Sequence, residues 1–261
     1  MKKYIISIIS VFLIYFLHYK NYSYELKKEL LLSSYIKGIN LADAHGIISI
    51  KDNQFYISLK AQTVGLFSIF TKWSQKISSK GIINFSSIQS ELYKSEDQRG
   101  NKKGHMYIKY KNNYPEIISA QPDPRDDDRR KSIKKELLNN TLDPIIGIIS
   151  IGLDGTCNNN QIVFDGKRKY ILKPNFIGRE EISKDHFYNK AFDAIKCAFQ
   201  IDKIAGYTKK ELKKYPKNGI IWFRKEKNNL YFPIKIEISS SWGKFVCLIK
   251  ERKLNSESNN M

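Results

Sequence analysis

One stretch of the sequence contains several residues of the types that most often carry chemistry. It begins at Cys157 and includes Asp165-Gly166 and Arg168. A cysteine serves as a nucleophile, a metal ligand or half of a disulfide. A nucleophile needs a lowered pKa, but Cys157 follows the C-terminus of a predicted helix, where the helix dipole has the wrong sign. A metal site needs more closely spaced ligands than the three scattered cysteines supply. We therefore expect no metal here.

A disulfide explains the cysteines best. Cys157, Cys197 and Cys247 give one bridge and one remaining thiol. We expect Cys157 to pair with Cys197, which lies between Ile195 and Phe199 on one face of a predicted strand. The bridge closes a loop of about 40 residues, worth on the order of 4 kcal/mol in the chain-entropy model. Cys247 is predicted to be a buried free thiol that behaves as a small apolar residue.

The Asp165-Gly166 pair predicts a hairpin turn. It lies between two strand-like runs, and a type I′ turn needs positive φ at both central residues. After the turn, Lys167 and Lys169 share one strand face, so Arg168 points to the other. We predict a polar site at Arg168. The role of Arg168 is either structural, as the ion-pair partner of Asp165 or Asp143, or functional, as a contact to an anionic ligand.

Other catalytic and cofactor patterns do not occur. The sequence has no Gly-x-Ser-x-Gly, phosphate-binding loop or dinucleotide fingerprint. His45, His105 and His186 fall in predicted strands without a second ligand at metal spacing. Glu180-Glu181 fall in a predicted hairpin tip, where adjacent carboxylates point to opposite faces. The acids within 121–136 alternate with arginines, which predicts an exposed, self-neutralised loop and no calcium site. We assign no catalytic residue and expect no cofactor.

Mainly β structure is expected to position these residues. Alternation of apolar and polar residues predicts about ten strands between residues 25 and 252. Helical spacing predicts short helices within 65–73 and 143–151, and one or two exposed turns at 208–215. Asp143 suits the N-cap of the second helix, which is nearly all apolar and should be buried. Without βαβ alternation, the pattern predicts one antiparallel domain, either an open barrel or a sandwich.

The N-terminus predicts export. Lys2-Lys3 precede an uncharged run from Tyr4 to Leu17, which suits a signal-peptide core of about 7–15 residues better than a membrane span of about 20. We predict a signal peptide at residues 1–23, for a periplasmic, envelope or secreted protein. No Ala-x-Ala precedes the cut, so an uncleaved anchor that associates with the membrane through residues 4–17 remains open, as does a buried cytosolic helix. Residues 253–261 should form a disordered tail.

The formal net charge of +19 favours anionic partners, either nucleic acid or lipid. Dedicated nucleic-acid proteins concentrate arginine and aromatic residues in a patch. Here lysines are scattered through every segment. Nucleic acid is therefore disfavoured as a partner.

Several segments together resemble a bacterial family of exported proteins known as domain of unknown function 3108. The matching segments follow one another between about residues 30 and 250. They are Tyr35-Ile-Lys-Gly-Ile39, Thr63-Val-Gly65, Thr141-Leu-Asp-Pro144, Cys157 with Val163-Phe-Asp-Gly-Lys-Arg-Lys-Tyr170, Cys197 with Ile204-Ala-Gly-Tyr207, Pro233-Ile-Lys-Ile236 and Trp242-Gly243. Lys167 and Lys169 stand where the family has arginine. The resemblance implies an exported, mainly β protein with a two-cysteine bridge and no established activity.

Three hypotheses for function follow. The first is a non-enzymatic envelope protein whose sheet binds an apolar ligand, a lipid or a protein partner. The second is a secreted effector or surface protein that binds acidic partners through its lysines. The third is an enzyme acting on envelope polymers, which requires Asp165 and Arg168 to converge with a base in a cleft.

Overall fold

The computed structural model describes residues 25–84, 87–226, 229–240 and 243–253. The predicted signal peptide or anchor, with its run at residues 4–17, lies outside the described residues. So does the predicted tail, apart from Lys253, which ends a strand instead. Within the described ranges, no helix is long and apolar enough to cross a membrane.

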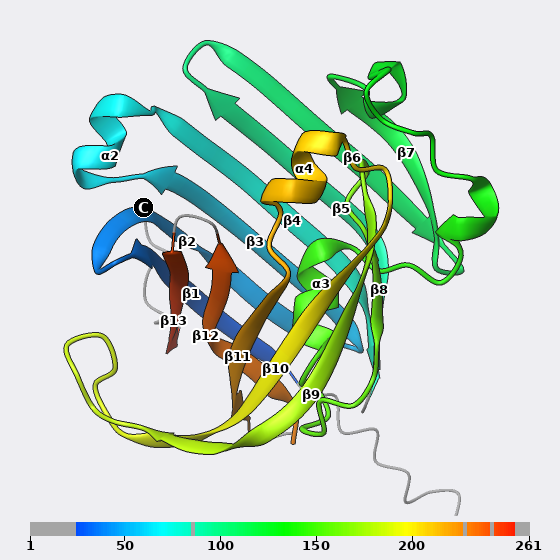
Figure 1. The fold of residues 1–261 in the computed structure, drawn as a ribbon. Helices are drawn as coiled ribbons and strands as arrows, with labels where there is room; N and C mark the ends of the chain where they lie inside the picture. The colour runs from blue at the N-terminus through cyan, green and yellow to red at the C-terminus, as the bar shows by residue number, and fades with distance from the viewer. Residues whose placement is uncertain (1–24, 85–86, 227–228, 241–242, 254–261) are drawn as a thin grey trace, which may run out of the picture.

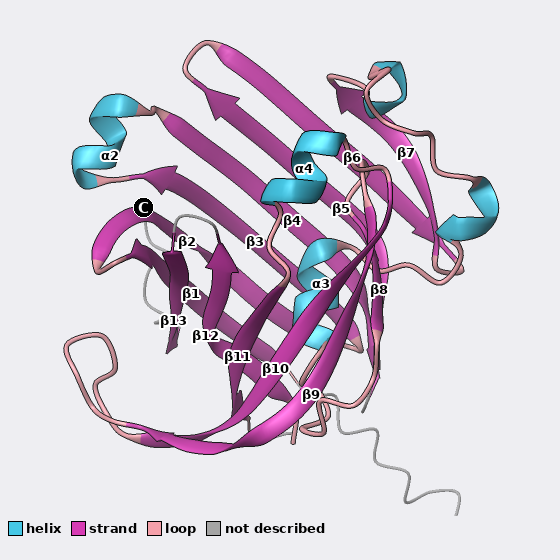
Figure 2. Cartoon of the chain, in the orientation of Figure 1, coloured by secondary structure: helices cyan, strands magenta, loops and turns pink. Residues whose placement is uncertain are grey.

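Thirteen antiparallel strands form one sheet that curls into a nearly closed barrel (Figures 1 and 2). All strands that follow one another in sequence are neighbours in the sheet except β7 and β8, and the two ends of the described chain pair through β1 and β13. The strands are β1 (Leu26–Ile36), β2 (Ile39–Lys51), β3 (Gln54–Thr63), β4 (Trp73–Asn84), β5 (Ser87–Arg99), β6 (Lys102–Lys111), β7 (Tyr114–Gln121), β8 (Gln161–Phe164), β9 (Lys169–Ile182), β10 (Phe192–Ala205), β11 (Asn218–Lys225), β12 (Tyr231–Ser240) and β13 (Gly243–Lys253).

The predicted fold class, mainly β and antiparallel, is confirmed. Of the two predicted architectures, open barrel and sandwich, the structure has a nearly closed barrel, and its thirteen strands exceed the predicted number of about ten. β7 is not among the predicted strands, because Asn112-Asn-Tyr-Pro115 has the composition of a turn. In the structure the turn is Asn112-Asn113, both with positive φ. Pro115 lies in β7, which is an edge strand. Proline has no backbone N–H, and an edge strand tolerates this because one of its sides has no neighbouring strand to bond.

The β9–β10 hairpin also differs from the prediction. Glu180 and Glu181 lie within β9, and the tip is formed by residues 183–191, which place His186 in a loop. The Glu180 carboxylate pairs with Lys196 at 3.0 Å and accepts a hydrogen bond from Trp222 Nε1 at 3.0 Å. These partners on β10 and β11 let the strand continue through the acidic pair.

Three short α-helices occur among the described residues: α2 (Gly65–Phe70), α3 (Pro144–Ser150) and α4 (Lys209–Lys214). α3 lies on the concave side of the sheet with Ile146 and Ile149 buried (Figure 1). α4 is exposed and begins with a capping box between Thr208 and Glu211. Two 3-10 turns, Pro124–Asp126 and Lys135–Leu138, lie in the loop after β7.

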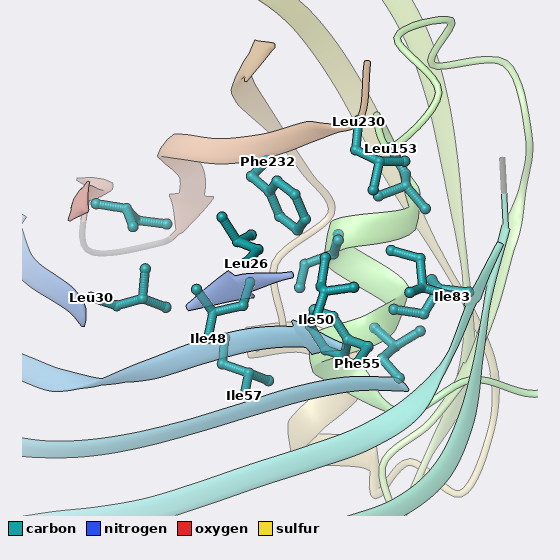
Figure 3. Packing of buried hydrophobic residues seen from close by; sticks show 14 of the residues in the cluster. Leu26, Leu30, Ile48, Ile50, Phe55, Ile57, Ile83, Leu153, Leu230 and Phe232 are labelled. Carbon is teal, nitrogen blue, oxygen red and sulfur yellow. The ribbon is translucent and has the colours of Figure 1, made fainter. Parts of the chain in front are cut away.

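One buried cluster packs between α3 and the inner face of the sheet, with residues from β1–β5, β12 and β13 (Figure 3). Alternate residues of each strand point inward, among them Ile48 and Ile50 of β2 and Phe55 and Ile57 of β3. Each such side chain contributes about 1.5–3 kcal/mol on burial. The alternation that predicts the strands therefore also supplies the core that curls the sheet around α3.

The two edge strands, β7 and β8, are both described in full and do not pair with each other. We call the region between them the seam. The hydroxyl of Tyr110 donates across it to the carbonyl of Phe164 at 3.0 Å. On the β8 side, Leu142 lies beside the strand and forms an isolated parallel bridge with Val163. Side chains and the connection from β7 to α3 therefore close the barrel where the backbone ladder does not.

Candidate functional site

Cys157 and Cys197 form a disulfide with their Cα atoms 5.9 Å apart. Both are fully buried, in a cluster with Val163 of β8 and Phe199 of β10. Cys247 is a buried free thiol. The bridge thus fixes the start of the segment that leads into β8 against the middle of β10.

Asp143 is a buried structural group. One carboxylate oxygen accepts the backbone N–H groups of Ile145 and Ile146 at 2.9 and 3.1 Å. The other accepts the hydroxyls of Ser79 on β4 and Ser90 on β5, both at 2.8 Å. Burial raises the pKa of Asp143, although these four hydrogen bonds oppose the rise. The carboxylate therefore fastens the start of α3 to the sheet and does not meet Arg168.

Asp165 closes the β8–β9 hairpin. Its Oδ1 accepts the backbone N–H groups of Lys167 and Arg168 at 2.8 and 2.7 Å. The predicted hairpin is present, but the type I′ prediction is wrong. Only Gly166 has positive φ, at 90°, because the aspartate cap moves the centre of the turn to residues 166–167. Glycine at the first central position is the pattern of a type II′ turn.

Arg168 pairs with Asp165, Nη2 to Oδ2, at 2.7 Å, and its guanidinium carbon lies 4.2 Å from the centre of the Tyr215 ring. A third contact reaches Glu211 at the start of α4, at 3.4 Å. Glu211 in turn receives two hydrogen bonds from Arg130, both 2.8 Å. Arg168 is thus the centre of an ionic network that joins the hairpin turn, α4 and the loop after β7.

Glu211 makes this network sensitive to acid. Its burial alone would raise its pKa, but hydrogen bonds from Arg130 and the Thr208 backbone, with the charges of Arg168 and Arg130, lower it from 4.5 to about 2. This difference corresponds to about 3 kcal/mol of stability, present above pH 4.5 and lost as the pH falls toward 2.

We expect Glu211→Gln to be less stable than the unsubstituted chain by about 2–3 kcal/mol at pH 7, measured by urea unfolding. The gap should shrink steadily between pH 4.5 and pH 2, where both chains carry a neutral side chain at this position. A gap that is the same at pH 7 and pH 3 would contradict the assignment of the network to charge.

A pocket of about 280 Å³ opens at the seam, between the hairpin turn and the loop after β7. We call it the seam pocket. Its floor is apolar and belongs to one core cluster: Ile117, Ile133, Leu138 and Phe164. Its remaining lining is Pro124, Ser132, Gly166 and four cations, Arg125, Arg130, Lys131 and Lys167.

The four cations differ in how far they are neutralised. Arg125 pairs with Asp123 at 2.5 Å, and Arg130 pairs with Glu211 and Asp127. Lys131 and Lys167 form no ion pair with any acid that the structure describes. The pocket therefore offers an apolar surface beside two cationic amines that remain available to an anion.

Two other grooves have more polar lining residues than the seam pocket. One of about 580 Å³ lies over β9–β12 and is lined by Lys173, Asn175, Gln200, Asn218, Glu237 and Lys244, among others. A second of about 460 Å³ lies over β1–β3 and includes His45 and His186. The described residues contain no group of three or more His, Cys, Asp or Glu side chains that could hold a metal. The seam pocket is therefore the candidate site, because it alone among these three joins the predicted turn to a core cluster.

Sequence reasoning found one wall of the seam pocket and missed the other. Asp165 and Arg168 support the hairpin wall behind Gly166 and Lys167. The opposite wall comes from residues 124–138, of which the sequence predicts the part within 121–136 only as an exposed charged loop. The pairing of arginines with aspartates in this loop was expected. The hydrogen bonds from Arg130 to Glu211, which lies 81 residues further along the chain, were not. Two apolar residues were the signal available: Ile133 within the charged loop and Leu138 just after it.

The fold and the pocket define a mainly β, barrel-like protein with a pocket of about 280 Å³ at an open seam. Residues 23–250 match the family described as "Protein of unknown function (DUF3108)", and the chain belongs to that family. The resemblance noted in the sequence is thereby confirmed.

Two solved structures are similar to the chain. A beta-barrel-like protein of domain of unknown function DUF1849 from Brucella abortus shares 8% identity, with 88% of this chain and 100% of that one covered and a TM-score of 0.49. A DUF1329 family protein from Desulfovibrio piger shares 10% identity, with 92% and 89% covered and a TM-score of 0.22. No curated protein matches the chain.

Proposed function

We propose that this protein is an exported, non-enzymatic binding protein of the cell envelope. Its ligand is a small apolar molecule with an anionic group, such as a short fatty acid or one end of a longer acyl chain. The composition of the seam pocket carries the proposal, because an apolar floor lies beside Lys131 and Lys167. Alkyl groups leave water for such a floor, and a carboxylate forms charge-assisted hydrogen bonds with lysine amines.

The size of the pocket limits the ligand. Its volume of about 280 Å³ is just below the range of about 300–1,000 Å³ that is usual for small-molecule sites. A ligand with about eight carbons, or the end of a longer one, suits this space better than a whole lipid. Export is supported by the predicted signal at residues 1–23 and by the disulfide, since disulfides persist in oxidising compartments.

The other two hypotheses have less support. A polymer-cleaving enzyme built on Asp165 would need that carboxylate free to act in a cleft. Instead it caps the hairpin and pairs with Arg168. A binder of acidic macromolecules would use the same lysines, but it gives no role to the apolar floor formed by Ile133 and Phe164.

Calorimetric titration with octanoate tests the proposal. The titrated protein is the full chain with Ile9→Asp and Leu13→Asp, which interrupt the apolar run at residues 4–17 that would itself bind acyl chains. Ser132→Trp places an indole in the pocket mouth and should weaken binding at least about tenfold by excluding the ligand. The control Ser183→Trp, in the β9–β10 loop, should bind like the parent. Equal loss in both variants, or in neither, would reject the pocket as the site.

A further inference from the structure

We infer that α2 and the turns beside it dock the protein onto a membrane surface rich in anionic phospholipid. α2 carries four large apolar side chains that face solvent: Leu66 is 71% exposed, Phe67 41%, Ile69 72% and Phe70 84%. None of its residues is buried. Monomeric soluble proteins rarely display such a cluster without a partner. This surface lies outside the seam pocket and does not depend on the proposed ligand.

The chain holds this helix in place. The Thr63 hydroxyl donates to the carbonyl of Thr71 at 2.7 Å and accepts the N–H of Trp73 at 3.2 Å, which closes the loop at its base. Val64 N–H donates to the carbonyl of Leu41 on β2 at 3.1 Å. The apolar side chains are therefore presented on a fixed protrusion at the end of β3 and β4 (Figure 1).

Cations surround the apolar tip. Lys72 follows α2 directly, and its carbonyl accepts the N–H of Gly100 at 2.8 Å, which brings the β5–β6 turn alongside. Residues 97–103 of that turn contain Arg99, Lys102 and Lys103 with one acid, Asp97. All four cations are exposed, and none forms an ion pair with an acid in the described part of the chain.

This combination selects a lipid surface over a second copy of the chain. Apolar side chains that enter the boundary between headgroups and acyl chains, with cations at the phosphate level, are the pattern of an interfacial anchor. Trp73, partly buried at the start of β4, suits the same depth. A symmetric dimer through this surface would instead set the four cations of each copy against those of the other, which like-charge repulsion opposes.

Vesicle co-sedimentation of the full chain carrying Ile9→Asp and Leu13→Asp tests the inference. Vesicles contain either phosphatidylcholine alone or phosphatidylcholine with about one third phosphatidylglycerol. We expect binding to the mixed vesicles to exceed binding to neutral ones by at least about tenfold, because each nearby cation adds to attraction by the anionic surface. Ile69→Asn with Phe70→Asn should lower binding at least about tenfold by removing most of the inserted apolar area.

Two matched controls complete the experiment. The double variant Ile118→Asn with Leu212→Asn should bind like the parent. It changes two exposed apolar residues outside α2: Ile118 on β7, which is 56% exposed, and Leu212 on α4, which is 47% exposed. Lys72→Glu with Lys102→Glu should abolish the preference for anionic vesicles, whereas Lys209→Glu with Lys210→Glu on α4 should keep it. Equal binding by the α2 variant and its control would overturn the inference. A dimer in sedimentation velocity that Ile69→Asn with Phe70→Asn dissociates would also overturn it, by assigning the surface to a second copy.

Discussion

Asp143→Ala is expected to destabilise the protein by about 3–5 kcal/mol, the largest effect of any single substitution considered. The change leaves two serine hydroxyls and two helix N–H groups without their acceptor inside the barrel. Each unsatisfied buried group costs about 1–3 kcal/mol, partly relieved when the structure adjusts. Urea unfolding at neutral pH, followed by circular dichroism, measures the loss.

Asp143→Asn is the matched control. Its carbonyl oxygen can still accept the N–H groups that begin α3, and the serine hydroxyls can turn to accept from its amide, so we expect a smaller loss of about 1–2 kcal/mol. Because burial raises the pKa of Asp143 in the folded state, the aspartate's contribution is greatest below the unfolded pKa and falls as the pH rises. The stability of the parent relative to the asparagine variant should therefore decline with rising pH. An alanine variant as stable as the asparagine variant would refute the hydrogen-bonded role of this carboxylate.

Removal of the disulfide is the second large expected effect. Cys157→Ala with Cys197→Ala opens a loop defined by a separation of 40 residues and should cost about 4 kcal/mol. That loop contains β8, the hairpin turn and β9, so limited proteolysis should cleave there first. Urea unfolding under non-reducing conditions measures the change in free energy.

Cys247→Ala provides the comparison, since it removes one buried sulfur without opening a covalent loop. We expect it to cost about 1–2 kcal/mol, as for other small truncations in a core. If the double variant loses no more than this control, the bridge does not stabilise the fold.

Local signals in the sequence predicted the parts of the structure that depend on neighbouring residues. Asp143 followed by Pro144 marked the start of α3, because a cap and a first-turn proline act within a few residues. The exposed turns predicted at 208–215 are present as α4, although its capping box of Thr208 and Glu211 was not predicted. Alternation predicted the sheet class, since side chains on successive strand residues point to opposite faces. The Cys157–Cys197 pair followed from the small number of possible bridges.

The remaining features depend on side-chain contacts that residue patterns do not show, and most of these contacts join residues far apart in sequence. The turn at Asp165 shifted by one residue because the carboxylate accepts two N–H groups, which an Asp-Gly pattern alone does not reveal. Arg168 and Arg130 share Glu211, which comes from a different element. The seam pocket lies between β7 and β8, which are neighbours in sequence but form the two edges of the sheet. No pattern within either strand encodes this arrangement.

The seam pocket is proposed to bind an apolar molecule through its floor and an anion through Lys131 and Lys167. Titration of octanoate into the 15N-labelled full chain, with Ile9→Asp and Leu13→Asp in place, tests it most directly by following each backbone amide. We expect saturable shifts concentrated at five residues that line the pocket: Ile133, Leu138, Phe164, Gly166 and Lys167. Shifts confined to the grooves over β9–β12 or β1–β3, or none when octanoate is in large excess, would contradict it.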